Sequence, residues 1–431
     1  MREDVDIVSP GRVRRNFLVL MAYHVVLRAA WIFKTEGVVM PAFLAAVAGP
    51  GWVQGLLPLL NRLSQSLPPV FAADALRDAP RKSRWLMLTT GGMAAGALAW
   101  SLLIVLTEDA DGSLPAGVFV PAVFLVGYTL FFVATGLNQV VFGTLQGKLI
   151  PAERRGALMG RAGLIGSATA VTAAVLFLGR WSGETPGDFV VPFALTAAGM
   201  TIAVGLASLT AETPDEPQGP RAGVRLVGPL KDAAAAVRSD RDFAIACGCG
   251  ALFVAAQLIF PHYVTWAGAV TGGTSESLLL FLVSQNLGAG MTGLAVGRVA
   301  DRAGNRLALR VVLAGSALAP LAAIGASAVG TTSAFAAAFF LMGLMPVTFR
   351  TLTNYVLELV PRASHPRYVG TLRLAFAAPV VFAIPVGAAV DACGHAPVFA
   401  VTAAVIASAA VLIGFAREPR GDGADASAGG R

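Results

Sequence analysis

The sequence predicts an all-α membrane protein in which twelve transmembrane helices form two six-helix halves. Composition is the first reason: 56% of the 431 residues are hydrophobic, only 13% are charged, and the mean hydropathy is +0.70. An ordinary soluble domain has about 25% charged residues. The second reason is that twelve apolar runs are each long enough to cross a hydrocarbon core, which takes roughly 20 residues. The third is that Lys and Arg residues gather in alternate connections between those runs.

The predicted spans are continuous apolar runs without the period-two alternation of membrane barrel strands, so we expect helices. In chain order they are 16–45, 52–75, 85–107, 117–147, 157–180, 189–210, 242–268, 277–299, 307–329, 333–360, 369–392 and 397–416.

The basic residues predict the topology. Because cytoplasmic loops carry an excess of Lys and Arg, both tails and the basic loops are expected on the cytoplasmic side of the cell membrane. Five of the 32 basic residues depart from this pattern: Arg180 in an outer loop, and Arg28, Lys34, Arg62 and Arg350 inside spans. The net charge of +7 is spread over all the cytoplasmic loops, so no nucleic-acid partner is expected.

The chain divides into five predicted parts: a cytoplasmic tail (1–15), an N-terminal half (16–210), a linker (211–241), a C-terminal half (242–416) and a second cytoplasmic tail (417–431). The linker should contain a short amphipathic helix over 230–238.

No enzyme, cofactor or metal site is expected. The run Gly288–Gly293 fits the pattern Gly-x-Gly-x-x-Gly, but it lies in an apolar span with no strand before it. It therefore predicts close helix packing. The expected partners are the lipid bilayer and a small-molecule substrate, and we expect a monomer.

One loop carries a resemblance to a known family. The residues Gly297-x-x-x-Asp301-Arg302-x-Gly304-x-Arg306, between spans 8 and 9, resemble the loop motif of the major facilitator superfamily. The twelve spans, the central linker and the turn from Pro151 to Gly156 before span 5 are also similar to that family. Further stretches resemble a bacterial subgroup of unknown substrate. The first-half copy of the motif is degenerate, with Val70 and Arg77 where glycines would stand. Span 5 also lacks the Gly-Pro step of the drug/proton antiporters.

The resemblance implies a transporter whose halves enclose a substrate site. The loop motif predicts a cytoplasmic gate, because Asp301 would face the N-terminal end of span 5 and could pair with Arg161. By pseudo-symmetry Asp74 would pair with Arg373, and Arg302 and Arg306 belong to the same gate. The alternative is that these residues are only loop charges that obey the positive-inside rule.

Three arginines are the predicted centre of the substrate site. A charge inside the bilayer costs about 2.5–3.5 kcal/mol on insertion scales, so it is rarely without a use. Arg28, Arg62 and Arg350 lie near the middle of spans 1, 2 and 10 without an equal number of carboxylates, and guanidinium suits a carboxylate or phosphate. The alternative is a structural pair between Arg28 and Glu36. Glu36 is also the candidate proton-coupling residue, unless Lys34 neutralises it.

Four polar residues are further candidates for substrate binding. They lie on spans 1, 4, 7 and 10, which line the cavity in the family that the sequence resembles: His24, Asn138, Gln257 and Asn354. Pro261 should kink span 7, because proline cannot donate the helical hydrogen bond.

The sequence thus predicts a secondary active transporter that moves a small anionic organic solute by alternating access, driven by protons or by an exchanged solute. Two alternatives remain open at this point. One is a proton-coupled efflux carrier for drugs or natural products, and the other is a non-transporting membrane sensor or assembly partner.

Overall fold

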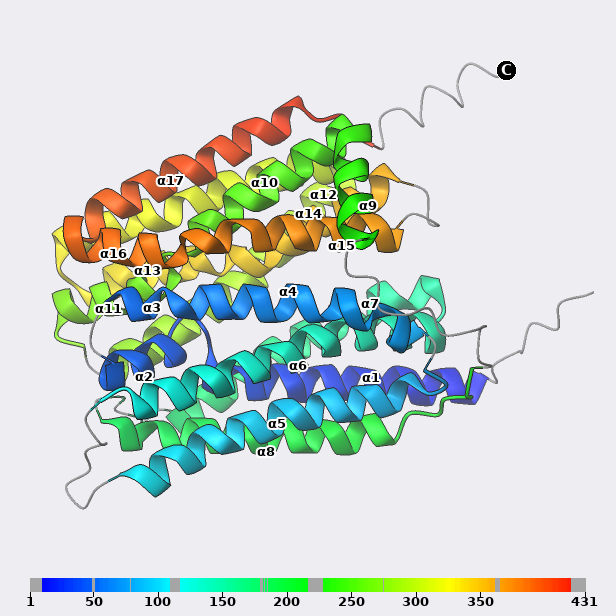
Figure 1. The fold of residues 1–431 in the computed structure, drawn as a ribbon, viewed down its shortest axis with the longest axis horizontal. Helices are drawn as coiled ribbons and strands as arrows, with labels where there is room; N and C mark the ends of the chain where they lie inside the picture. Colours follow the sequence, from blue (N-terminus) through cyan, green and yellow to red (C-terminus); the bar gives the residue numbers. More distant parts are fainter. Residues whose placement is uncertain are drawn as a thin grey trace, which may run out of the picture.

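The computed structural model describes residues 10–48, 51–77, 79–108, 117–178, 181, 183, 185–215, 228–273, 275–360 and 365–419. Within these ranges the secondary structure is helical and contains no strand. Figure 1 shows the helices running side by side in two stacked groups, one from each half of the chain. The predicted all-α fold with two helical halves is confirmed.

The first half consists of helices that follow one another with short connections. They are α1 (Pro10–Trp31), η1 (Ile32–Lys34), α2 (Val39–Ala48), α3 (Gly51–Gln54), α4 (Leu56–Arg77), α5 (Lys82–Thr107), α6 (Phe119–Leu149), α7 (Ala152–Leu178), η2 (Pro186–Phe189) and α8 (Val190–Ser208).

A separate helix, α9 (Gly228–Ser239), precedes the second half. The second half consists of α10 (Arg241–Gln257), α11 (Phe260–Thr271), α12 (Ser275–Val329), α13 (Thr332–Met342), α14 (Leu344–Leu359), α15 (His365–Ala377), η4 (Ala378–Phe382), α16 (Ala383–Cys393), α17 (His395–Leu412) and η5 (Ile413–Phe415).

Eleven helical segments of the described chain are long and apolar enough to cross a membrane, so this is a multi-pass membrane protein. The remaining predicted span, 52–75, corresponds to α4. This helix has 22 residues but carries Asn61, Arg62 and Gln65. In Figure 1 α4 lies at the border between the two halves. Its polar side chains are therefore placed where the halves meet.

The first span is broken, contrary to the single continuous run that the sequence predicts. Helix α1 ends at Trp31, and the backbone turns extended at Thr35 before α2 begins at Val39. The Thr35 carbonyl accepts hydrogen bonds from the Val38 and Met40 amides, at 3.4 and 3.1 Å. Its hydroxyl accepts another from the Val39 amide. Side-chain and carbonyl acceptors thus satisfy donors at the start of α2.

Later spans are interrupted for reasons that can be read from their glycines and prolines. The predicted kink in span 7 is confirmed: α10 ends at Gln257, and Pro261 lies in the first turn of α11. Span 10 breaks at Gly343, where an added Cβ would collide with the backbone of α12 at Ala289. A Cβ on Gly288 would collide with the Phe340 carbonyl, which confirms close packing by this glycine.

The long helix α12 contains two spans, Glu276–Ala300 and Arg302–Val329, which meet at Gly304. Gly304 has φ +85°, a backbone conformation that favours glycine, and a Cβ there would also meet the Glu418 carboxylate. The reversal between spans 8 and 9 is therefore tighter than the predicted loop.

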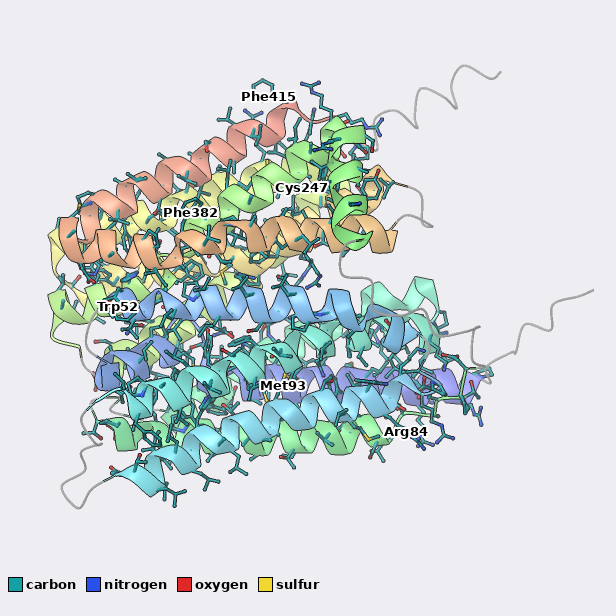
Figure 2. All side chains as sticks on the ribbon, in the orientation of Figure 1. Trp52, Arg84, Met93, Cys247, Phe382 and Phe415 are labelled. Carbon is teal, nitrogen blue, oxygen red and sulfur yellow. The ribbon has the colours of Figure 1, made fainter. Side chains whose placement is uncertain are left out.

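The predicted linker contains helix α9, which stands across the direction of the other helices at one end of the bundle (Figure 1). Ala236 is buried, whereas Lys231 and Arg238 are exposed. The start of α1 and the end of α17 lie at this same end, which we predict to be cytoplasmic. At the opposite end from Arg84 lies Trp52, whose amide donates to Asp391 and joins the two halves (Figure 2).

A buried carboxylate ties the end of α8 to the start of α5. The side chain of Glu212 is 1% exposed and accepts hydrogen bonds from the Lys82 and Ser83 amides at 2.9 and 2.8 Å. The Lys148 ammonium lies 2.8 Å from Glu212 and 2.8 Å from Asp215. Glu212 therefore supplies an anion to the positive N-terminal end of α5 as well as to a lysine.

The same arrangement recurs in the second half, as expected for repeated halves. Glu418 follows α17 and accepts a hydrogen bond of 3.0 Å from the Arg306 amide, just after Gly304. The Arg306 guanidinium donates to the Ala416 carbonyl, at 2.9 Å. Each half thus closes its last span onto its third span through a glutamate.

Glu212 should make stability depend on pH. Burial alone would raise the pKa of this carboxyl, but hydrogen bonds from Lys148, Ser83 and Lys82 outweigh burial and lower the pKa below 4.5. A lowered pKa in the folded state means that the stabilisation is complete above the unfolded pKa and is lost as pH falls through the folded pKa.

We expect Glu212→Gln to reduce the free energy of unfolding at pH 7 by about 2 kcal/mol, since charged hydrogen bonds are lost. The Tm of the purified protein in detergent, measured from pH 7 to pH 3.5, should fall less steeply for this variant than for the wild type. Asp215→Asn is the matched control, because Asp215 is 41% exposed and should contribute less. An equal loss of Tm in both variants would contradict the role given to Glu212.

Candidate functional site

A cavity of about 380 Å³ lies between the two halves. Its walls come from α1, the break after it, α4 and α6 of the first half, and from α10, α11, α14 and α15 of the second. The family pattern predicts contributions from spans 1, 4, 7 and 10, and the structure adds spans 2 and 11. Four of the predicted site residues line it: Glu36, Arg62, Gln257 and Arg373, the last of which the sequence assigns to the gate.

Arg62 faces this cavity without an acidic partner. Its guanidinium carbon lies 4.4 Å from the centre of the Phe349 ring, so α4 and α14 meet through a cation–π contact. No carboxylate of the described residues forms a salt bridge with Arg62. Its nitrogen atoms are also absent from the buried atoms that lack a hydrogen-bond partner. The charge is therefore open to a ligand.

Arg373 supplies a second guanidinium from the other half. Its Nη1 atom donates to Gln139 Oε1 at 3.2 Å, and Gln139 donates in turn to Gln65 at 3.1 Å. Gln65 donates to Asn61 at 2.6 Å. Arg62 and Arg373 both line the cavity and repel each other electrostatically across it.

A close approach of α4 and α6 makes this chain of amides possible. A Cβ at Gly136 would collide with the backbone of Gln65, so only a glycine allows this spacing. Gln139 lies one helical turn further along α6 and therefore reaches Gln65.

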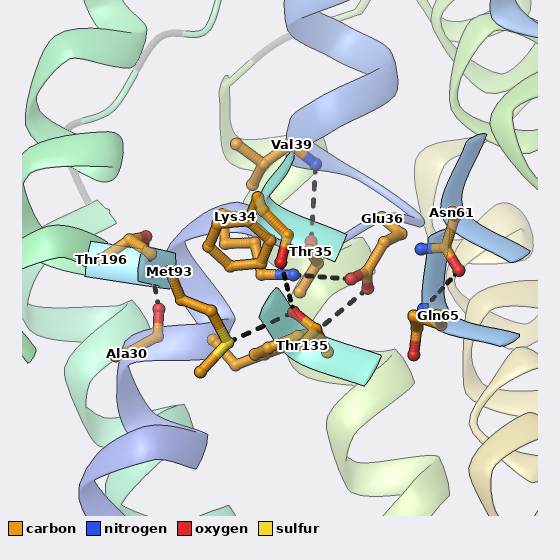
Figure 3. A network of polar contacts seen from close by, with 12 residues as sticks. Ala30, Lys34, Thr35, Glu36, Val39, Asn61, Gln65, Met93, Thr135 and Thr196 are labelled. Atoms are coloured by element: carbon orange, nitrogen blue, oxygen red, sulfur yellow. Dashed lines mark hydrogen bonds and ion pairs between the residues drawn. The ribbon is translucent and has the colours of Figure 1, made fainter. Parts of the chain in front are cut away.

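Lys34 and Glu36 form an ion pair at the edge of the cavity. Lys34 is 0% exposed, and its ammonium lies 2.6 Å from Glu36 Oε1 and 3.1 Å from the centre of the Trp31 ring. Phe131 and Phe132 each lie 4.6 Å from the same ammonium. Figure 3 shows Glu36 between Lys34 and the Asn61–Gln65 pair. Lys34 therefore neutralises Glu36, which was one of the two possibilities left by the sequence.

Gln257 closes the cavity at the end of α10. Gln257 is 6% exposed, and its Oε1 atom is buried without a hydrogen-bond partner. The polar groups around the cavity thus include two guanidiniums, one neutralised carboxylate, several amides and the hydroxyls of Ser66, Tyr128 and Thr353.

Arg28 and Arg350 form a separate basic group together with His24. The two arginines repel each other and both act on His24, but none of the three lines the cavity. Arg28 packs against Gly166 of α7, and its Nε atom is buried without a partner. Arg350 is exposed. The alternative pairing of Arg28 with Glu36 is not what the structure shows, because Glu36 binds Lys34 and Trp31.

The sequence of this chain also matches a family model. The family model of the Major Facilitator Superfamily matches residues 70–378. The chain belongs to the Major Facilitator Superfamily. It is a transporter rather than an enzyme.

Solved structures of the superfamily have the same fold. A mutant of the nucleoside transporter NupG superposes with a TM-score of 0.68 at 12% identity, covering 92% of this chain and 98% of that one. A D-xylose-proton symporter superposes with a TM-score of 0.67 at 14% identity, covering 94% of this chain and 98% of that one. A variant of the E. coli fucose:proton symporter FucP superposes with a TM-score of 0.61 at 16% identity, covering 94% of this chain and 99% of that one. A search of curated proteins finds no match.

Two of the predicted substrate-binding amides, those of Asn138 and Asn354, lie away from the cavity. Asn138 is 4% exposed and donates to Tyr23, Thr89 and Thr90 at 2.9–3.0 Å, so its amide serves to join α1, α5 and α6. Asn354 is exposed and does not line the cavity. The apolar runs place both residues on the expected spans, but they do not show which neighbouring residues form hydrogen bonds with the amides.

The predicted gate is described only in part. The side chains of Asp74 and Asp301 lie outside the described residues, so their pairing stays a prediction. Arg302 and Arg161 are exposed, and the Arg161 guanidinium lies 6.0 Å from the centre of the Phe17 ring. Arg306 holds the chain after α17, as shown above. Arg373, which the sequence assigns to the gate, is directed into the cavity.

Sequence reasoning overlooked several cavity residues of this transporter. Arg373 lies four residues inside predicted span 11, close enough to a basic loop to be counted with it. Its position within the predicted span, rather than in the loop, was the signal that could have identified Arg373 as a cavity residue. Aromatic residues such as Tyr128 and Phe349 gave no such signal, because apolar spans contain many aromatic residues that face lipid or other helices.

The Lys34–Glu36 pair should be tested by a double-mutant cycle. Glu36→Gln leaves a fully buried ammonium without its carboxylate, and we expect a loss of about 2–3 kcal/mol in stability. This is below the value for a fully buried pair because Glu36 is 27% exposed toward the cavity. The double variant Lys34→Met with Glu36→Gln should recover much of the loss. Unfolding in detergent measures each variant, and a double variant less stable than both single variants would contradict the pairing.

Proposed function

We propose that this protein is a secondary active transporter that moves a small organic anion across the cell membrane by alternating access. The observation that carries the proposal is the pair of guanidiniums in the cavity, Arg62 from the first half and Arg373 from the second. A bound anion would contact both halves at once and would link their movements.

The charge balance of the cavity supports an anionic cargo. Among the described residues that line it, Glu36 is the only acidic one, and its charge is already met by Lys34. Arg62 and Arg373 therefore present an excess of two positive charges. A planar guanidinium donates two parallel hydrogen bonds to a carboxylate, so an anion would relieve the repulsion between the two arginines.

Glu36 remains the candidate for proton coupling although Lys34 pairs with it, because Glu36 lines the cavity and its side chain is 27% exposed. The Glu36 carboxylate attracts Arg62, so a proton bound at Glu36 would remove a negative charge that competes with the anion. It also leaves the ammonium of Lys34 unneutralised beside the cavity. Binding of a proton and binding of an anion therefore favour each other, and by linkage the effect is reciprocal. Such a linkage would support proton–anion symport.

We expect Arg62→Gln and Arg373→Gln each to reduce uptake of an organic anion by proteoliposomes at least tenfold, because a charged hydrogen bond contributes about 1.5–3 kcal/mol. Arg62→Lys should retain part of the activity, since it keeps the charge and loses the planar fork. Arg238→Gln is the control, because Arg238 is exposed on α9. Wild-type uptake of every anion by both Gln variants would refute anion transport.

A role of Glu36 in proton coupling can be tested by transport. We expect an inward proton gradient to drive uptake of an organic anion by wild-type proteoliposomes, and Glu36→Gln to lose this drive while it still exchanges the anion across the membrane. Glu276→Gln, at an exposed carboxylate, should behave as the wild type. Gradient-driven uptake by Glu36→Gln at the wild-type rate would exclude Glu36 as the coupling group.

A further inference from the structure

The walls of the cavity are rich in aromatic side chains, which favour a ligand with an aromatic ring as well as a negative charge. Five of its 21 lining residues are aromatic, whereas aromatic residues make up 8% of the chain. They come from both halves: Trp31, Tyr128, Phe260, Phe349 and Phe376. An aliphatic acid would not need this enrichment, because leucine and valine provide equivalent apolar surface.

The guanidinium of Arg62 is itself arranged for a flat ligand. Phe349 holds it by a cation–π contact, and Phe349 is held in turn by edge-on contacts with Phe253 and Phe376 at 5.2 and 5.1 Å. A guanidinium fixed against one ring can stack its other face on a second ring while its edge binds a carboxylate.

The size of the cavity limits the ligand further. At about 380 Å³ it lies near the lower end of the range for small-molecule sites, roughly 300–1,000 Å³. One or two fused rings with a carboxylate fit this volume, whereas a large amphipathic drug does not.

We propose that the cargo is an aromatic carboxylate, bound with its carboxylate between Arg62 and Arg373 and with its ring among the five aromatic side chains. The inference rests on the proposed anion transport and adds the chemical class of the anion. It also assigns Arg373 and Phe349 as specificity-determining residues: Arg373 recognises the charge, and Phe349 positions the guanidinium of Arg62 for the ring.

Calorimetry on the purified full-length protein can test the class with four probes of related size. We expect benzoate and 2-naphthoate to bind at least fivefold more tightly than cyclohexanecarboxylate, since aromatic contacts add about 0.5–1.5 kcal/mol each. Benzamide, which has the ring without the charge, should bind at least tenfold more weakly than benzoate.

Variants then show whether the named side chains cause the preference. Phe349→Leu should reduce the ratio of benzoate to cyclohexanecarboxylate affinity toward one, while Phe382→Leu, at a ring that is 59% exposed and outside the cavity, should leave it unchanged. Arg373→Gln should weaken both acids by a similar factor. The thermal unfolding curve of each variant in detergent confirms that it is folded.

The possible failures are distinguishable. Equal affinity for benzoate and cyclohexanecarboxylate, with both lost in Arg62→Gln, would overturn the aromatic class and leave anion transport in place. Equal affinity for benzoate and benzamide, or no binding of any of the three acids, would overturn both proposals.

Discussion

The structure depends on how charge is accommodated between apolar helices, where no water is available to solvate it. Lys34 shows the requirement most clearly, since its buried ammonium contacts a tryptophan ring and one carboxylate. That carboxylate can reach it only because the first span breaks at Thr35, which brings Glu36 to the edge of the cavity. The break in the helix thus allows the ion pair, and the ion pair allows Lys34 to be buried beside the cavity.

The same requirement separates structural charges from functional ones. At the ends of the bundle Glu212 and Glu418 are bound by backbone amides of the neighbouring helix in each half. In the middle, Arg62 and Arg373 have only a ring and an amide as partners among the described residues. The paired carboxylates hold the helices of each half together, and the two arginines remain available for a ligand that changes with every transport cycle.

Sequence patterns predicted the helices well because span length, basic loops and proline kinks are local properties. The kink before Pro261 and the close packing at Gly288 were both predicted and confirmed. The site was predicted less completely. Of the three mid-span arginines, only Arg62 lines the cavity, whereas Arg28 and Arg350 form a group of their own. Hydropathy gives the depth of a side chain in a span but not the direction in which it points.

The amino-acid sequence by itself determined the fold class, the number of apolar segments and the presence of charges that need partners, because each follows from the composition of a single segment. Tertiary structure decided which charges meet. Lys34 rather than Arg28 neutralises Glu36, because the first span breaks at Thr35 and brings the two side chains together. Arg373 rather than Arg350 lines the cavity with Arg62, because helices α4, α6 and α15 approach one another at positions set by glycines such as Gly136. Contacts between residues more than 200 positions apart depend on packing across the whole bundle, and no pattern within one span contains that information.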